Sequence, residues 1–473
     1  MEKRPAEDEE NGEGENGAKK AKLDPECGRL LFCGSTNWEY VNKPCKLKDD
    51  FYYSKQNVYE PMFLAAFKDI RIRHLGSSQD AGHVVVVDED GQAWSWGNNE
   101  FGQLGQGDLK NRRVPTPMPN TGPTGHIIVM VALSKRHTLL LTSRGEVLAC
   151  GDNTDGQCGQ GEMKSTTVNN GRVREELETN SIERVLELTP INYSGPPVIK
   201  ISSGMDFNML LDVEGCVWTF GSQEFGKCGT GTDGAYNAAE AKVKMRYAGI
   251  SEPHKITRVY ERDAKTKKTK SLQMMRIKSI AAGSHHAAMV DEMSRVFTWG
   301  AGSYGRTGLG DTTDTLVPTW VQSLDHPRGK IEEVYCGNMC TVMLGKGHRQ
   351  VFLAGIVDAL KKEANMVPKQ YFEFGDAGLR DIGFFKKGWN HVGDDGSVMQ
   401  TNTGPCYGEL GTGEKFRNQG VPKKSKEFEY ANILKVGTGA NHCVYLIRDT
   451  EEEDAEEMEE YEVLDQTDIE YKE

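Results

Sequence analysis

Short runs of apolar residues recur along the chain, and most of these runs begin with a histidine. Examples are HVVVVD at 83–88, HTLLLT at 137–142 and HCVYLI at 442–447. Helical periodicity is not apparent at comparable length, and β-branched residues fill the runs, so the pattern predicts short β-strands. Seven such strands are predicted to open at His83, His137, Phe207, His286, Cys340, His391 and His442, at separations of 54, 70, 79, 54, 51 and 51 residues.

In the first three repeats, a glycine follows the first apolar run. A second apolar run comes after this glycine and itself ends in a glycine, as in AWSWG at 93–97. A strand, a tight turn relieved by glycine and a second strand are therefore expected. Five repeats continue into the spacing G-x-x-G-x-G, which favours turn chemistry over a single phosphate-binding loop. The predicted structural turn glycines are Gly102, Gly105, Gly107, Gly156, Gly159, Gly161, Gly226, Gly229, Gly231, Gly305, Gly308, Gly310, Gly408, Gly411 and Gly413.

A unit with a few short strands cannot bury its apolar faces alone, so such units bury them against copies of themselves. The sequence predicts an all-β fold, a seven-bladed β-propeller. The last strand lacks a glycine-ended partner, and LFCG at 31–34 resembles AWSWG. We therefore expect the N- and C-terminal segments to pair and close the ring.

The predicted divisions of the chain are a disordered tail at 1–25, a propeller at 26–450 and an acidic disordered tail at 451–473. The repeats of the propeller are expected at about 28–75, 76–130, 131–198, 199–277, 278–332, 333–382 and 383–449.

The WG dipeptide followed by FGQLGQGD, on this period, resembles the propellers of the regulator-of-chromosome-condensation family. The resemblance covers roughly residues 28–449. Two repeats depart from the family pattern. The fifth lacks G-x-x-G-x-G, and the sixth has Asn402 where the strand-ending glycine is expected. Both blades are expected to be less regular than the others.

Charge is concentrated at the two ends of the chain. The formal net charge is −13, and residues 451–473 hold thirteen Asp/Glu and one lysine, a net of −12. Such a segment repels itself and is expected to be disordered. In the N-terminal tail, Lys3, Arg4, Lys19, Lys20 and Lys22 form two basic clusters. They suit a two-part nuclear import signal, and the alternative is a merely solvated arm.

One insertion carries a strong positive charge. Residues 232–276 contain eleven Lys/Arg and five Asp/Glu, a net of +6. An exposed basic loop on a rigid scaffold suits an acidic surface, a nucleic acid or the acidic tails of tubulin. The alternative is a solvated lysine loop. The candidate partner-binding residues are Lys255, Arg258, Arg262, Lys265, Lys267, Lys268 and Lys270.

The sequence predicts no catalytic residue, no cofactor and no metal. Five of the eleven histidines occupy one repeat position, which Phe207 and Cys340 occupy in other repeats, so a structural role is expected. The eleven cysteines include no CxxC pair and no signal peptide precedes them, so reduced intracellular thiols are expected. The longest clean apolar run is far too short to span a bilayer.

Function is implied by the family resemblance. It implies a mitotic or cell-cycle regulator that binds small GTPases of the Rac or Ral type, with Ran a weaker candidate, either as a guanine-nucleotide exchange factor or as a GTPase-binding regulator. The alternative is a non-enzymatic scaffold that binds chromatin or microtubules at centromere, spindle and midbody. A nuclear import receptor is a further expected partner. The implied locations are the nucleus, including the nucleolus, in interphase and the centromere, spindle and midbody in mitosis, with a cytosolic fraction.

Overall fold

The computed structural model describes residues 24–36, 38, 57–161, 167–169, 172–174, 183–237, 245–263, 265–324, 330–356, 364–373, 378–385, 388–405, 410–412, 416–428, 431–448 and 461–466. Regular structure in these ranges consists of β-strands and of short 3-10 turns, which confirms the all-β prediction. The turns are η2 (Ala65–Phe67), η3 (Glu224–Gly226), η4 (Ser303–Gly305), η5 (Gln322–Leu324) and η6 (Lys346–His348).

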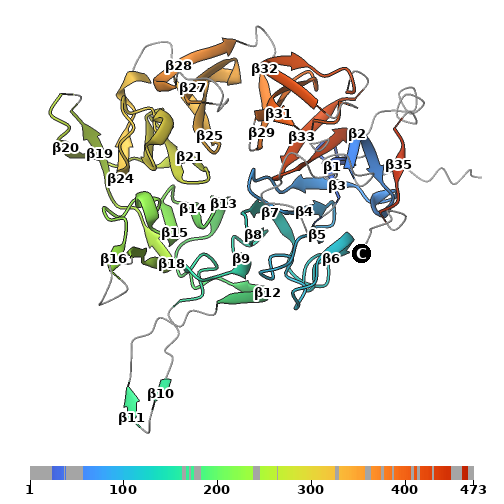
Figure 1. Cartoon of the computed structure of the whole chain (residues 1–473), viewed down its shortest axis with the longest axis horizontal. Helices are drawn as coiled ribbons and strands as arrows, with labels where there is room; N and C mark the ends of the chain where they lie inside the picture. The colour runs from blue at the N-terminus through green and yellow to red at the C-terminus, as the bar shows by residue number, and fades with distance from the viewer. Residues whose placement is uncertain are drawn as a thin grey trace, which may run out of the picture.

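The strands are arranged in a β-propeller around a central axis (Figure 1). Five blades are separate sheets, each built on four antiparallel strands. Four of these sheets hold only those four strands, and the fifth has two more strands along its outer edge. One of the five sheets consists of β7 (Ile128–Leu133), β8 (His137–Thr142), β9 (Val147–Asp152) and β12 (Arg184–Pro190). The next consists of β13 (Val198–Ser203), β14 (Phe207–Asp212), β15 (Val217–Ser222) and β18 (Gly249–Lys255).

The other three separate sheets lie on the second half of the ring. Their strands are β21 (Ile277–Ala282), β22 (His286–Asp291), β23 (Val296–Gly300) and β24 (Thr315–Trp320); β25 (Ile331–Cys336), β26 (Cys340–Gly345), β27 (Gln350–Gly355) and β28 (Asn365–Glu373); and β29 (Leu379–Phe385), β30 (Gly388–Gly393), β31 (Val398–Pro405) and β32 (Phe416–Lys424).

The two ends of the chain pair in one sheet, as predicted. Strand β1 (Gly28–Ser35) lies antiparallel to β34 (His442–Arg448), with Leu31 opposite Tyr445 and Cys33 opposite Cys443. This nine-stranded sheet also holds β2 (Asn57–Leu64), β33 (Ile433–Thr438), β3 (Ile72–Leu75), β4 (His83–Asp88), β5 (Ala93–Gly97), β6 (Arg112–Pro117) and the short β35 (Val463–Leu464). Strand β1 joins β3 through the single pair Gly28–Ile72. The ring is therefore closed by hydrogen bonds between its first and last strands.

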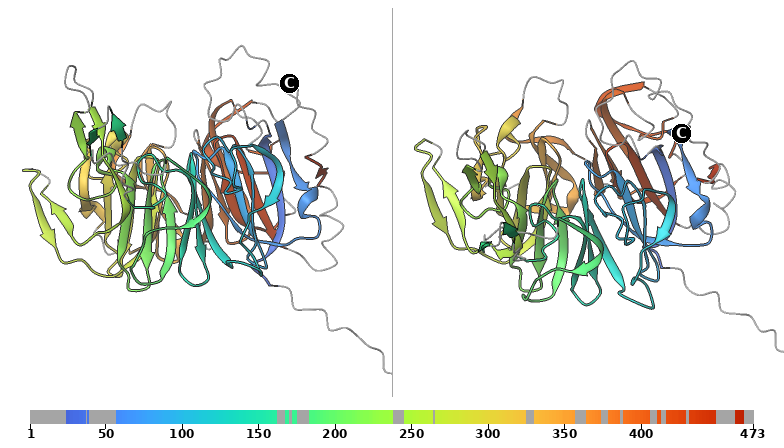
Figure 2. Two further views of the ribbon diagram at one scale, coloured as in Figure 1. Left: turned by 90° about the horizontal axis from the view of Figure 1, so that it is seen from below. Right: turned by 60° about the horizontal axis from the view of Figure 1, so that its bottom comes forward.

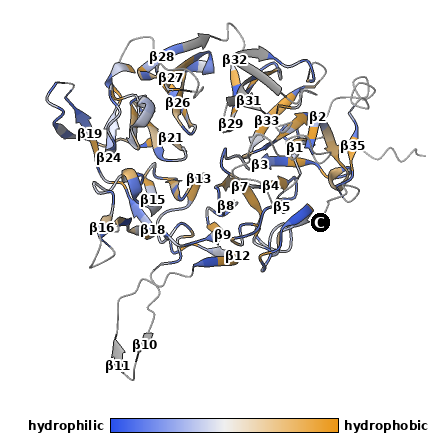
Figure 3. Cartoon of the chain, viewed as in Figure 1, coloured by the Kyte–Doolittle hydropathy of each residue, from blue (hydrophilic) through white to orange (hydrophobic). Residues whose placement is uncertain are grey.

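The hydrophobic clusters of the described residues lie between neighbouring blades. In β4, Val84 and Val86 belong to the cluster shared with β1 and β34, whereas Val85 and Val87 belong to the cluster shared with β7–β9. Alternate side chains of a strand point to opposite faces, so both faces of a blade are buried. Figure 3 shows hydrophobic colour along the strands and hydrophilic colour on outer hairpins such as β19–β20.

The repeated residues that were predicted to open strands do so in six of seven cases. The exception is His391, which lies inside β30. Three of the histidines bridge adjacent blades: His83 and His286 bond Thr138 and Thr341 at 2.8 Å, and His137 bonds Asn208 at 2.7 Å.

The partner side chains of these histidines bond the previous blade in turn. The Thr138 hydroxyl donates to the Gln103 carbonyl, and the Thr341 hydroxyl to the Arg306 carbonyl. Because each hydroxyl proton is used in this way, the Thr138 and Thr341 oxygens accept from His83 and His286, and the Nε2 atoms of these histidines carry the proton. The predicted structural role of these histidines is confirmed for His83, His137 and His286.

Thirteen of the fifteen predicted turn glycines lie in the described part of the chain, with φ between 61° and 93°. Gly408 and Gly413 lie outside the described residues. At Gly156, φ is 80° and an added Cβ would lie 2.6 Å from the Ser251 Cα, so left-handed backbone and close approach both require glycine there.

The predicted tails differ in how much of each is described. Residues 1–23 lie outside the described residues, with the import candidates Lys3, Arg4, Lys19, Lys20 and Lys22. In the acidic tail, residues 461–466 differ from the expected disorder, because β35 pairs in parallel with the edge of β2. The physical reason is local: Tyr461 and Leu464 are apolar enough to pack on neighbouring clusters despite the acidic surroundings.

We predict that acid destabilises the ring through its buried histidines. Burial lowers the pKa of His83, His391 and His442 to about 3. The unfolded chain then binds more protons than the folded chain between pH 6.5 and 3, so stability falls as pH falls in that window. Each of these histidines should lower the free energy of unfolding by about 2 kcal/mol when the pH falls from 7 to 5. Asp155 and Asp381, whose pKa burial raises to about 6, oppose this by about 1 kcal/mol each.

Urea denaturation at pH 7 and at pH 5 measures the free energy of unfolding and so tests this loss of stability. His83→Gln keeps a donor for Thr138 but removes one titrating group, so its stability should depend less steeply on pH. Val213→Ala, at an exposed turn position without a titratable group, is the control and should keep the wild-type slope. Equal free energies of unfolding at the two pH values would contradict the prediction.

Candidate functional site

The last part of the predicted basic insertion forms a hairpin at the outer rim of the ring. Strand β19 (Val259–Arg262) pairs antiparallel with β20 (Thr269–Leu272), and Tyr260 also pairs with Thr319 of β24 in the next blade. Figure 2 shows this hairpin extending beyond the side of the disc. The insertion thus has regular structure and is fixed to two blades.

Two of the seven candidate basic residues anchor the hairpin. Arg262 donates to Asp311 at 2.7 Å and to the Leu309 carbonyl at 3.1 Å, and Lys267 lies 3.0 Å from the same Asp311 carboxylate. Burial acts to raise the pKa of Asp311, but hydrogen bonds from Thr313, Lys267 and Arg262 hold it well below its usual range. These two cations stabilise the fold rather than face a partner.

The remaining candidates present charge to solvent. Lys255 places its ammonium 5.4 Å from the centroid of the Trp218 ring, so part of its charge interacts with the blade. Arg258, Lys265, Lys268 and Lys270 are exposed, with no ion pair among the described residues. These four form the available basic surface.

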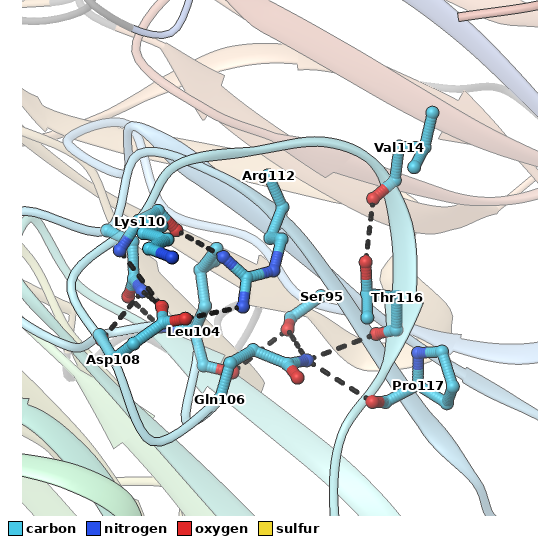
Figure 4. A network of polar contacts seen from close by, with 10 residues as sticks. Ser95, Leu104, Gln106, Asp108, Lys110, Arg112, Val114, Thr116 and Pro117 are labelled. Carbon is cyan, nitrogen blue, oxygen red and sulfur yellow. Dashed lines mark hydrogen bonds and ion pairs between the residues drawn. The ribbon is translucent and has the colours of Figure 1, made fainter. Parts of the chain in front are cut away.

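The aspartate after the last motif glycine has the same function in another blade. Asp108 pairs with Arg112 at 2.8 Å, and Gln106 donates to Ser95 and to the Pro117 carbonyl (Figure 4). Asp108 therefore binds an arginine of its own loop, whereas Asp311 binds an arginine of the preceding insertion. The GxGD spacing was the sequence signal for this anchor, and sequence reasoning did not use it.

A groove of about 720 Å³ lies beside the turn loops of two blades. Asp155 comes from one blade, and Asp206 and Glu224 come from the next. The hairpin of β16 (Ala235–Asn237) and β17 (Met245–Tyr247) forms another wall, where Tyr236 is 48% exposed and Met245 is 52% exposed. Carboxylates beside exposed aromatic and apolar side chains suit a partner with basic and apolar groups.

The carboxylates of the groove lie around a fully buried cation. The Lys227 ammonium lies 2.6 Å from Asp206 and 4.0 Å from Glu224, and its side chain is 0% exposed. Burial, followed by the charge of Asp206, raises the pKa of Asp155 to about 6. A cationic partner group at Asp155 would lower that pKa and favour the ionised carboxylate.

The central channel is closed near one end by a contact across the ring. The Gln79 amide donates to the Ser284 hydroxyl at 2.8 Å, and that hydroxyl donates to Asp80. The channel encloses about 300 Å³ and is lined by the inner strands, including Lys200, which pairs with Glu333 at 3.1 Å. The channel polar groups are therefore largely engaged with one another.

Sequence reasoning missed the groove and the channel contact. Both depend on residues from different blades, and no local motif marks them. In the part of the chain that the structure describes, no group of three or more His, Cys, Asp or Glu is placed to hold a metal ion. Nor does any described helix have the length and hydropathy needed to cross a membrane.

Comparisons with known proteins agree with this architecture. The family model described as RCC1-like domain matches residues 54–445. The chain is 30% identical to Protein RCC2 of Homo sapiens over 442 residues, which is 92% of this chain and 79% of that protein.

Solved structures give the same fold. Prp20p from Saccharomyces cerevisiae, studied for its binding to Gsp1p and histones, is similar with a TM-score of 0.64 at 17% identity, covering 93% of this chain and 95% of that one. Yeast RCC1 (Prp20), solved with Kap60 bound to it, has a TM-score of 0.64 at 18% identity, covering 95% and 98%. At these identities the likeness is one of fold alone.

We predict that the Lys227–Asp206 pair stabilises the groove. Asp206→Ala leaves a buried ammonium with only the distant Glu224, which should lower the free energy of unfolding by about 3 kcal/mol. Urea denaturation checks this, with Glu224→Gln as the matched control that should cost less than about 1 kcal/mol. A loss at Asp206 no larger than the loss at Glu224 would contradict the structural role of the pair.

Proposed function

Because the chain belongs to the family of RCC1-like domain proteins, we propose that it is a cell-cycle regulator that binds a small GTPase of the Rac or Ral type. The observation that carries the proposal is the 30% identity to Protein RCC2 over nearly the whole chain. The family resemblance implies both the cell-cycle role and the GTPase partner. Ran remains a weaker candidate.

Nucleotide exchange is compatible with a site that has no catalytic residue. An exchange factor breaks no covalent bond: it binds the nucleotide-free GTPase more tightly than the loaded form, and linkage then lowers the affinity for nucleotide. We place the GTPase contact at the groove of Asp155, Glu224 and the β16–β17 hairpin. Its carboxylates and exposed apolar groups fit a protein surface with lysine or arginine beside apolar residues.

Blade number and domain boundaries extend the proposal. We count seven blades, dividing the nine-stranded sheet at the single pair Gly28–Ile72. Support comes from the hydrophobic clusters, since each one joins two neighbouring blades around a closed circuit. The proposed propeller spans 26–450, between a tail at 1–25 and an acidic tail at 451–473.

Location follows from the same membership. We propose the nucleus in interphase and the centromere, spindle and midbody in mitosis. The N-terminal basic clusters would be recognised by a nuclear import receptor, and the solved complex of yeast RCC1 (Prp20) with Kap60 is the supporting parallel.

A second candidate function rests on the rim hairpin. Arg258, Lys265, Lys268 and Lys270 face solvent on or beside a hairpin whose Arg262 is paired with Asp311. A fixed basic surface attracts phosphate or carboxylate arrays without sequence preference. We propose that a non-enzymatic scaffold role on chromatin or microtubules uses this surface, and it is compatible with GTPase binding at the groove.

The GTPase proposal is tested by release of a fluorescent nucleotide from Rac, Ral and Ran. The chain should accelerate release from a Rac- or Ral-type GTPase. The double variant Asp155→Asn/Glu224→Gln should reduce the acceleration about thirtyfold, because each of the two lost charged contacts contributes on the order of 1 kcal/mol. Glu146→Gln/Glu214→Gln, at turns on the opposite ends of the strands, is the control. No acceleration and no binding to any nucleotide-free GTPase would refute the proposal.

The scaffold proposal is tested by pelleting with microtubules and with nucleosomes. Lys265→Glu/Lys268→Glu/Lys270→Glu should abolish pelleting at low salt, since three attractions become repulsions. The variant Lys110→Glu/Arg144→Glu/Lys346→Glu makes the same charge change at exposed positions on other blades. Equal loss in both variants would assign the effect to net charge and contradict a specific hairpin surface.

A further inference from the structure

The acidic tail returns to the ring and covers the outer edge of the closing blade. Val463 and Leu464 pair in parallel with Phe63 and Leu64, and the Phe63 amide donates to the Glu462 carbonyl at 2.9 Å. Residues 461–466, here called the strap, therefore occupy backbone groups that an edge strand otherwise offers to another chain.

Tyr461 attaches the first residue of the strap to the blade. Its ring meets Phe63 edge-on, with centroids 5.7 Å apart and planes at 78°. Its hydroxyl donates to the Glu427 carbonyl at 2.9 Å. The phenol therefore joins the strap to β2 of the closing blade and to the segment that connects β32 with β33.

The strap is weakly held in comparison with the ring. Its ladder is two residue pairs long, whereas β1 and β34 share seven. Val463 is 59% exposed, and the buried Gln466 amide has neither its nitrogen nor its oxygen bonded among the described residues. Short ladders with few buried contacts open at far lower free energy than core strands. The strap should detach while the ring stays closed.

We propose that Tyr461 is a phosphorylation site that controls whether the strap covers β2. A tyrosine kinase transfers the γ-phosphoryl group of ATP to the phenolic oxygen, the phenolic proton passes to the kinase base, and ADP leaves. The kinase acts on the detached strap, because in the docked strap the hydroxyl is engaged with Glu427. Eight Asp/Glu lie in residues 451–460, directly before the tyrosine, and suit an enzyme that selects acidic sequences.

Phosphorylation opposes redocking for two reasons. The phenolic oxygen loses its proton, so it can no longer donate to the Glu427 carbonyl. The phosphate also carries a charge of about −1.5 to −2, and in the docked strap it would face the Glu427 carbonyl oxygen, which repels it. Phosphorylated chains should therefore keep the strap detached and leave the outer edge of β2 open to another strand.

The test is hydrogen exchange on the full-length chain with and without tyrosine phosphorylation. The kinase is chosen as one that phosphorylates a synthetic peptide of residues 455–468. After phosphorylation of the chain, amide exchange in β2, above all at Phe63, should accelerate about tenfold, while β34 should stay protected. Tyr461→Phe cannot be phosphorylated at this position, and Tyr471→Phe is the matched control that should behave like the wild type.

Three outcomes would overturn the proposal. The first is a chain that is not phosphorylated at Tyr461 although the peptide is. The second is unchanged exchange at Phe63 in the phosphorylated chain. The third is slower exchange, which would mean that the phosphate pairs with Arg29, whose guanidinium lies 3.8 Å from the centroid of the Phe63 ring. None of these readouts depends on a GTPase, so the result is separate from that of the exchange assay.

Discussion

The ring is stable only because neighbouring blades share their cores. Val84 and Val86 of β4 pack toward one neighbour, and Val85 and Val87 pack toward the other. A blade removed from the ring would expose both faces, which the hydrophobic effect strongly disfavours. Three buried histidines, His83, His137 and His286, add direction to this packing. Each donates to a side chain of the next blade, and that side chain donates in turn to a backbone carbonyl of the histidine's own blade. Closure is therefore a condition of folding for every blade.

A scaffold held in this way can carry variable segments without loss of order. The rim hairpin and the groove hairpin are both insertions, and an ion pair lies beside each. One pair fixes the rim hairpin, and the other lies in the turn loops that line the groove. Asp311 receives Arg262, and Asp206 receives Lys227. The ion pairs engage some charges of each site and leave others available, so Lys265 is exposed at the rim and Asp155 is half-buried in the wall of the groove. Two surfaces of opposite charge are thus presented on one molecule.

Much of the fold could be predicted because its signals are local and repeated. A strand start at His83 or a left-handed turn at Gly156 depends on a few adjacent residues, and repetition makes each signal stronger. The candidate site could be predicted only in part. The basic hairpin was visible as charge, but which cations are free depends on Asp311 of the next blade. The groove combines residues of two blades, and the strap lies in a segment whose composition indicates disorder; neither has a local pattern.

The pairing of β1 with β34 also affects how the protein is made. Strand β1 is synthesised before every other strand of the ring, yet its partner begins at His442, about 400 residues later. At synthesis rates of about 5–20 residues per second, the first strand waits roughly 20–80 s for the last. During that interval the nascent chain is an open arc with unburied faces at both ends. Chaperones that hold such faces apart would thus have their longest task at the amino-terminal blade.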